Sequence, residues 1–142
     1  MIKPRVVLDT NVIVSALLFP EGDSATIYKQ FVVQRLSLIY NMAIILEYQD
    51  VLRRPCFQFS LTDIEVLTAD IQQYGVICAP FPSSDDLFDE DARLFYYTAK
   101  SVNALLITDN KMHFPREPFI ITPSEYLTYY TTRIIERGLF MV

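Results

Sequence analysis

Four acidic residues stand where predicted elements of the chain begin or end. Asp9 and Asp109 each follow a short apolar run of the kind that predicts a buried parallel strand. Asp91 lies near the start of one predicted helix, and Glu47 lies within another. Ligands of open α/β sheets bind at the carboxyl ends of the strands, so we expect these acids to meet at one edge of the sheet. Carboxylates suit hard cations such as Mg²⁺ and Mn²⁺, and the pattern therefore predicts a divalent-metal site.

Without a bound cation, a cluster of carboxylates is electrostatically unfavourable. Two like charges about 4 Å apart repel by roughly 4 kcal/mol at an effective dielectric near 20. The acids must therefore either hold metal or carry raised pKa values. Metal bound in this way can activate a water molecule and stabilise the charge on a phosphodiester.

Each acid also has a simpler interpretation when it is taken alone. Asp9 is equally consistent with a cap of the following helix, and Glu47 is typical of a solvated helix face. Asp91 ends an acidic run over residues 85–91 that is typical of a solvated loop and first helical turn, and Asp109 alone is typical of a turn. For His113, the single histidine, the sequence favours a surface or capping role over metal ligation.

The elements that must position these residues alternate between strands and helices. Because the strands are continuous apolar runs, the pattern predicts an α/β fold with a mostly parallel sheet and helices on both faces. We expect one domain over residues 1–142, Ser24 as the cap of the second helix, and Pro123 at the start of the last helix. The predicted strands cover 5–9, 36–40, 76–79, 104–108 and 119–122, and the predicted helices cover 11–18, 25–35, 42–53, 62–74 and 91–101.

Composition narrows the class of protein. The chain has 142 residues, of which 51% are hydrophobic and 20% are charged, and this excludes an intrinsically disordered chain. Three glycines are too few for a fold built on a glycine-rich phosphate loop. No apolar stretch approaches the ~20 residues of a membrane span, and the N-terminus lacks the features of a signal peptide. Cys56 and Cys78 are expected to be free thiols in a reducing cytoplasm.

Charge alone argues against nucleic acid as a partner. The net charge is −5, and affinity for phosphates comes mainly from Lys and Arg. Cations bound by the acidic cluster would locally reverse the sign of the field.

Four segments that contain the acids resemble, in order, the motifs of the PIN-domain ribonucleases. They are Val-Leu-Asp-Thr-Asn-Val over 7–12, Ile-Leu-Glu-Tyr-Gln-Asp-Val-Leu over 45–52, Asp-Glu-Asp-Ala-Arg-Leu-Phe over 89–95, and Leu-Leu-Ile-Thr-Asp-Asn over 105–110. Residues 111–115 and 122–127 are similar to the branch of toxins from toxin–antitoxin pairs.

The resemblance implies a three-layer α/β/α fold and Mg²⁺- or Mn²⁺-dependent cleavage of single-stranded RNA. It also implies a small antitoxin as partner, and a dimer. The implied metal ligands and catalytic residues are Asp9, Glu47, Asp91 and Asp109. Thr10, Asn11, Thr108 and Asn110 would support them around the cofactor.

Two departures from the family pattern leave alternatives open. Many relatives carry an acid where this chain has Ala92, and the usual last acid aligns with Asn110 rather than Asp109. One alternative is therefore a degenerate member that binds RNA or a protein without cutting. A second is a small-molecule phosphohydrolase, which would require another Asp two residues after Asp9, where this chain has Asn11.

Overall fold

The computed structural model describes residues 3–79 and 90–130, apart from the side chains of residues 90 and 91. At its centre is a five-stranded sheet in the order β3-β2-β1-β4-β5, in which every neighbouring pair is parallel. The strands are β1 (Arg5–Leu8), β2 (Ser37–Tyr40), β3 (Val76–Ile77), β4 (Leu105–Ile107) and β5 (Ile120–Ile121).

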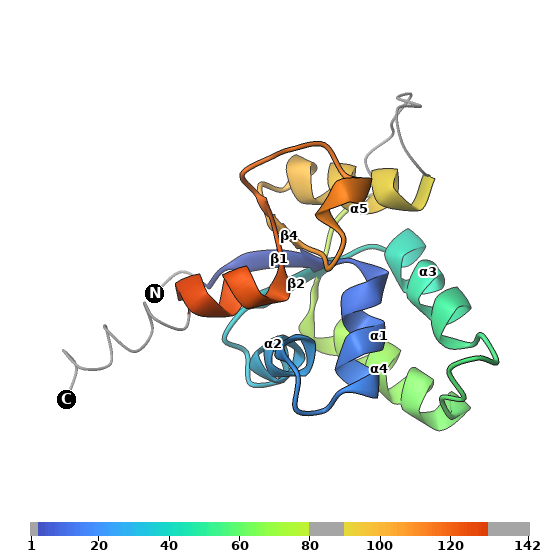
Figure 1. Cartoon of the computed structure of the whole chain (residues 1–142). Helices are drawn as coiled ribbons and strands as arrows, with labels where there is room; N and C mark the ends of the chain where they lie inside the picture. The colour runs from blue at the N-terminus through green and yellow to red at the C-terminus, as the bar shows by residue number, and fades with distance from the viewer. Residues whose placement is uncertain (1–2, 80–89, 131–142) are drawn as a thin grey trace, which may run out of the picture.

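Helices cover both faces of this sheet. Figure 1 shows α5 on one side of the strands and α1, α2 and α4 on the other. Val6, Val7 and Leu8 of β1 are accordingly fully buried, because a central parallel strand is covered on both faces. This architecture confirms the predicted three-layer α/β/α fold. The helices are α1 (Thr10–Leu18), α2 (Asp23–Val32), α3 (Met42–Leu52), α4 (Leu61–Tyr74), α5 (Glu90–Ser101) and the 3₁₀ helix η1 (Lys111–His113), and residues 123–130 are also helical.

The order of the strands creates a switch point between β1 and β4. From β1 the chain passes through α1 and α2 to β2 on one side, whereas from β4 it continues to β5 on the other side. Leu8 pairs with Ile107 at the carboxyl ends of the two strands. Asp9 and Thr108 therefore emerge side by side at the place where open α/β sheets bind their ligands.

The second helix differs from its predicted range. It begins at Asp23 with Gly22 as its N-cap, so the prediction that Ser24 would be the cap is wrong, and Ser24 is buried within the first turn. The helix also ends earlier than expected, at Val32, because Gln34 takes a left-handed conformation with φ of 63°. Pro123 begins a helix, as predicted.

Two further expectations about the chain can be compared with the structure. Both cysteines are free, with Cys56 exposed and Cys78 partly buried. Within residues 3–79 and 90–130, no helix is long and apolar enough to cross a membrane.

Candidate active site

Asp9 is held at the carboxyl end of β1 by hydrogen bonds from two strand ends. Its Oδ1 accepts a hydrogen bond of 2.8 Å from the backbone N–H of Thr10, and its Oδ2 accepts one of 2.7 Å from the Thr108 hydroxyl. The backbone N–H of Asp9 donates to the carbonyl of Ile107 at 3.0 Å. Asp9 is also the N-cap of α1, as its simpler interpretation predicts. Its capping role leaves the carboxylate fixed at the switch point of the sheet.

A pocket of about 210 Å³ opens beside this carboxylate. Glu47 of α3 lines the same pocket as Asp9, as the periodicity of that helix predicts. Ala92 of α5, the position at which the family resemblance implies an acid, also lines it. The remaining lining residues come from α1, α3, α5 and the segment after β4, and they are Thr10, Asn11, Val51, Arg54, Phe95, His113 and Phe114.

The electrostatic environment of Asp9 is unfavourable to its charge. Burial raises the pKa of the carboxyl group, and the negative charge of Asp109 raises the pKa further. The hydrogen bonds from Thr108 and Thr10 and the positive charge of His113 act in the opposite direction, but burial is the largest effect. A cation in the pocket would relieve this penalty.

Tyr48 supports the same strand end from within the core. Its hydroxyl donates a hydrogen bond of 2.5 Å to the carbonyl of Leu8, the residue that precedes Asp9. The ring is fully buried and stacks on Phe95 of α5 with centroids 6.1 Å apart. Burial raises the pKa of the phenol well above its ordinary value, and the charge of Asp9 adds to this effect, so Tyr48 stays a neutral donor. It thereby ties α3 to the carboxyl end of β1.

We expect Tyr48→Phe to lower the free energy of unfolding by about 1–2 kcal/mol, because the buried carbonyl of Leu8 loses its donor. Urea unfolding followed by circular dichroism measures the change. Tyr74→Phe is the matched control, since Tyr74 is 51% exposed at the end of α4 and should change stability by less than about 0.5 kcal/mol. Equal stabilities of the two variants would contradict a structural role for the Tyr48 hydroxyl.

Asp109 is not among the residues that line the Asp9 pocket. Asp109 lines a different pocket of about 270 Å³, where its Oδ2 accepts a 3.4 Å hydrogen bond from the Ser15 hydroxyl. Asp91 belongs to the first turn of α5, but its side chain lies outside the described residues. Among the side chains that the structure describes, no three His, Cys, Asp or Glu residues are grouped to hold a metal ion.

The polar residues expected to support Asp9 differ in how they contact it. Thr108 is fully buried and connects Asp9 to the next turn, because its Oγ1 also accepts a 3.0 Å hydrogen bond from the backbone N–H of Asn110. Thr10 reaches Asp9 through its backbone, and its own hydroxyl is buried without a partner among the described residues. Asn11 lines the pocket and is exposed.

Three residues of this pocket were not expected from the sequence. His113, Phe114 and Arg54 line it, and the charge of His113 reaches Asp9. His113 ends the one-turn 3₁₀ helix η1 and Phe114 follows it, and a helix this short has no sequence periodicity that indicates which way a side chain points. Arg54 follows α3 and pairs with Asp50 at 3.8 Å across the exposed surface.

The sheet order and the acid at its switch point define a class, the parallel α/β proteins that bind ligands at strand ends. The family model of the PIN domain matches residues 5–112, so the chain belongs to the PIN domain family. The fold is similar to that in the crystal structure of PAE2754 from Pyrobaculum aerophilum, with a TM-score of 0.62 and 12% sequence identity over 92% of this chain and 90% of that one. No curated protein matches the chain in sequence. PIN domains are generally nucleases, and they typically use divalent metals.

Proposed function

We propose that the protein is a metal-dependent endoribonuclease that cleaves single-stranded RNA. The observation that carries the proposal is the Asp9 carboxylate, which is fixed by two hydrogen bonds in a pocket that Glu47 also lines. A partly buried carboxylate with a raised pKa in a pocket that a second acid also lines is a typical functional-site arrangement. In the proposed reaction a water attacks phosphorus in line, the bond from phosphorus to O3′ breaks, and a 5′-phosphate and a 3′-hydroxyl result.

The donor atoms at this site fit a hard divalent cation. Asp9 and Glu47 supply carboxylate oxygens to the pocket. Asp91 belongs to the first turn of α5, and Asp109 follows Thr108 directly. These four residues would hold Mg²⁺ or Mn²⁺, which would lower the pKa of a bound water and neutralise charge on the phosphodiester. Thr108 and the N–H of Thr10 orient Asp9 through their hydrogen bonds, and Asn110 fixes Thr108 in turn.

We also propose that the protein is the toxin of a toxin–antitoxin pair, with a small antitoxin as its partner and a dimer as its assembly. The support is the similarity of residues 111–115 and 122–127 to the toxin branch of the family. Co-expression with the product of the neighbouring reading frame tests this assignment. Relief of growth inhibition by that product is the expected result, and a chain that is harmless alone would contradict it.

The proposed ligand role of Glu47 has a control on the same helix. Glu47→Gln is expected to lower metal-dependent RNA cleavage by about 10- to 100-fold, because a carboxylate oxygen in the pocket becomes an amide. Asp50→Asn removes the same charge from a side chain that is 75% exposed, and cleavage should change by less than about twofold. Initial rates on a labelled single-stranded RNA, measured with Mn²⁺ and with chelator, distinguish the two variants. Equal losses would remove Glu47 from the site.

One observation favours a second candidate, a member that binds RNA without cutting it. Ala92 lines the Asp9 pocket where an acid would otherwise contribute oxygen, and Asp109 is turned toward Ser15. The same assay decides between the candidates. RNA binding with no cleavage at any concentration of Mg²⁺ or Mn²⁺ would favour the non-cutting member.

A further inference from the structure

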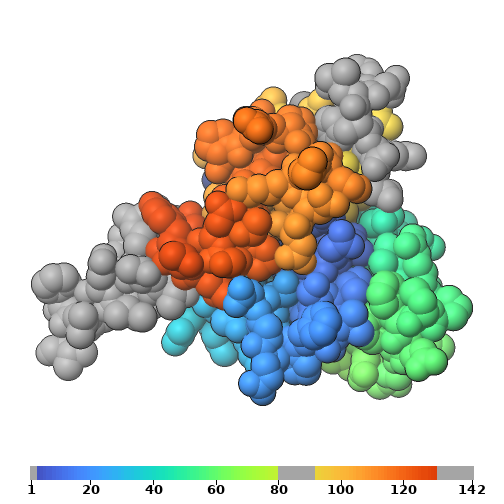
Figure 2. Space-filling model, viewed as in Figure 1, coloured from blue at the N-terminus to red at the C-terminus, as the bar shows by residue number. Residues whose placement is uncertain are grey.

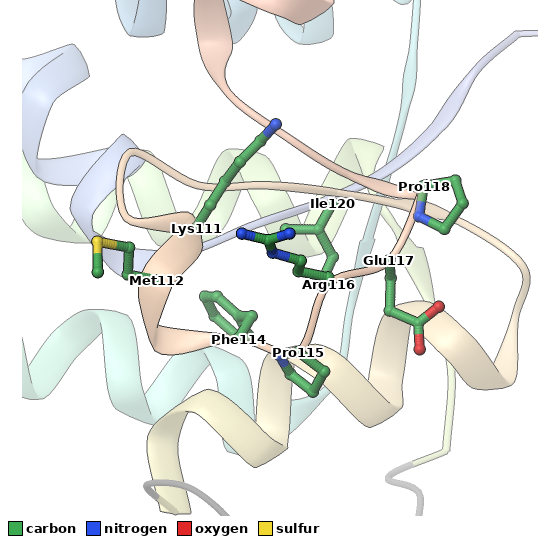
Figure 3. A pocket seen from close by; sticks show the side chains of 8 residues that line it. All are labelled: Lys111, Met112, Phe114, Pro115, Arg116, Glu117, Pro118 and Ile120. Carbon is green, nitrogen blue, oxygen red and sulfur yellow. The ribbon is translucent and has the colours of Figure 1, made fainter.

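A second and larger pocket follows the 3₁₀ helix η1, and neither the family match nor the acidic cluster assigns it a role. Its volume is about 720 Å³, within the roughly 300–1,000 Å³ range of sites that hold small ligands. The segment that forms it lies on the molecular surface, and Figure 2 shows its orange atoms meeting the blue atoms of α1. Figure 3 shows its lining, which includes Lys111, Met112, Phe114, Pro115, Arg116 and Ile120.

This pocket shares one lining residue, Phe114, with the Asp9 pocket. Phe114 lines both pockets and is only 7% exposed, so its ring forms part of the wall between them. His113, the preceding residue, lines the Asp9 pocket, whereas Pro115, the following residue, lines the larger one. The two pockets therefore lie next to each other along residues 113–115, and an RNA strand bound in the Asp9 pocket could extend over Phe114 toward the larger one.

The charges around the larger pocket favour an anion. Arg116 is exposed and makes no ion pair with any described residue, and Figure 3 shows its guanidinium between Lys111 and Phe114. Lys111 is partly neutralised by Glu125 at 2.6 Å. The acid that lines the pocket, Glu117, points away from Arg116 and accepts a hydrogen bond of 2.9 Å from the Tyr96 hydroxyl. A chain with a net charge of −5 thus presents a cation beside its acidic site.

Other residues that line the larger pocket offer apolar surface. Met112 is 95% exposed, and its thioether is a soft, adaptable surface for a flat ring. Pro115 and Phe114 add rigid apolar area at the base of the pocket. A cation beside apolar and aromatic surface is the combination by which proteins hold single-stranded nucleic acid.

We propose that this pocket binds the nucleotide of a single-stranded RNA that flanks the one in the Asp9 pocket. Arg116 contacts the phosphate, and Met112 contacts the base. The proposal rests on the proposed function, because it assigns a neighbouring position to the same RNA substrate. It predicts that affinity for RNA depends on the segment after β4 as well as on the acidic residues.

The test is binding of a fluorescein-labelled oligouridine of twelve nucleotides, followed by anisotropy in chelator over a series of salt concentrations. Arg116→Ala is expected to weaken binding about three- to tenfold and to reduce the slope of log K against log salt by about 0.7, the value for one phosphate contact on a single strand. Arg35→Ala is the matched control, because Arg35 is exposed and precedes β2 at the opposite end of the sheet. It should leave the slope unchanged.

A second variant examines the apolar half of the site. Met112→Ala is expected to weaken binding about two- to fivefold while leaving the salt slope unchanged, because it removes contact area and no charge. The Arg116 and Met112 side chains are both exposed, so neither substitution should unfold the protein, and thermal melts verify this.

The outcomes separate this proposal from the proposed function. The flanking site is overturned if Arg116→Ala has the same affinity and salt slope as Arg35→Ala. It is also overturned if the parent protein does not bind the oligouridine. Metal-dependent cleavage, measured separately on the parent, decides the nuclease assignment in either case. Binding that depends on Arg116 in a protein that never cleaves supports the flanking site and refutes the nuclease.

Discussion

Replacing Asp9 by asparagine is expected to lower metal-dependent cleavage of single-stranded RNA by at least about 100-fold while the protein remains folded. Asp9 is the acid fixed at the switch point, and all interpretations of the site as a metal centre depend on it. Asparagine keeps the shape and still caps a helix well, so α1 retains its N-terminal cap. The loss therefore reports on the carboxylate charge rather than on folding.

The same substitution has an expected effect on stability with a definite sign. Burial raises the pKa of Asp9 above its ordinary value of 3.8, so the folded protein holds this proton more tightly than the unfolded chain. Stability contributed by the protonated form is present below pH 3.8 and is lost as the pH rises through the raised pKa of the folded state. At neutral pH and without metal, Asp9→Asn should therefore be at least as stable as the parent, with a gain on the order of 1 kcal/mol.

Thermal melts in chelator and in millimolar Mg²⁺ or Mn²⁺ complete the test. A cation that binds only the folded state should raise the melting temperature of the parent by mass action, and it should do so much less for Asp9→Asn. If Asp9 only capped α1, stability would barely change and metal would affect neither protein. Identical metal responses in the two proteins would refute the metal site at its central residue.

A large loss of stability is expected from Gly75→Ala. Gly75 ends α4, and its backbone N–H donates a 2.8 Å hydrogen bond to the carbonyl of Ile71. A Cβ atom added there would lie 2.5 Å from that carbonyl oxygen, 2.9 Å from the carbonyl oxygen of Leu38 and 3.0 Å from the ring of Tyr40. The φ angle of −77° suits any residue, so the requirement is space between α4 and β2. Two of the three neighbours are backbone atoms, which cannot move aside as a flexible side chain would.

We expect Gly75→Ala to lower the free energy of unfolding by about 3 kcal/mol and the melting temperature by roughly 10 °C. Gly22→Ala is the matched control, because its Cβ would approach the Phe19 carbonyl oxygen only to 3.3 Å. That variant should lower stability by no more than about 1 kcal/mol, since Gly22 makes no side-chain capping hydrogen bond that alanine would remove and the loss is limited to the N-cap preference for glycine over alanine. Chemical denaturation of both variants measures the difference. Similar stabilities would show that α4 and β2 can separate at little cost.

Sequence patterns predicted the fold because its central strands, β1, β2 and β4, are largely buried. Apolar runs such as Val6-Val7-Leu8 have few other interpretations when they alternate with amphipathic helices. Boundaries were less predictable where the backbone decides them. Gly22 is the N-cap of α2, and the left-handed conformation of Gln34 stops this helix from continuing to Arg35. The apolar pattern of the sequence indicates neither feature.

The sequence predicted those site residues whose positions follow directly from a strand end or from the period of a helix. Asp9 follows β1 directly, and the period of α3 places Glu47 at the same pocket. Asp109 does not share that pocket because Thr108, the residue before it, points toward Asp9, and neighbouring side chains along an extended chain point in opposite directions. The pocket around Arg116 depends on the path of an irregular segment, and no periodicity in the sequence describes such a path.

The pairing of β1 with β4 also has a consequence for the time at which the site forms. The hydroxyl that fixes Asp9 belongs to Thr108, 99 residues later in the chain. At about 5–20 residues per second, roughly 5–20 s separate the synthesis of these two residues on the ribosome. During that interval the growing chain remains attached to its own messenger, yet the partner strand of the Asp9 site has not been made. Under the proposed function, this pairing of distant strands delays completion of the Asp9 site until after Thr108 has been synthesised.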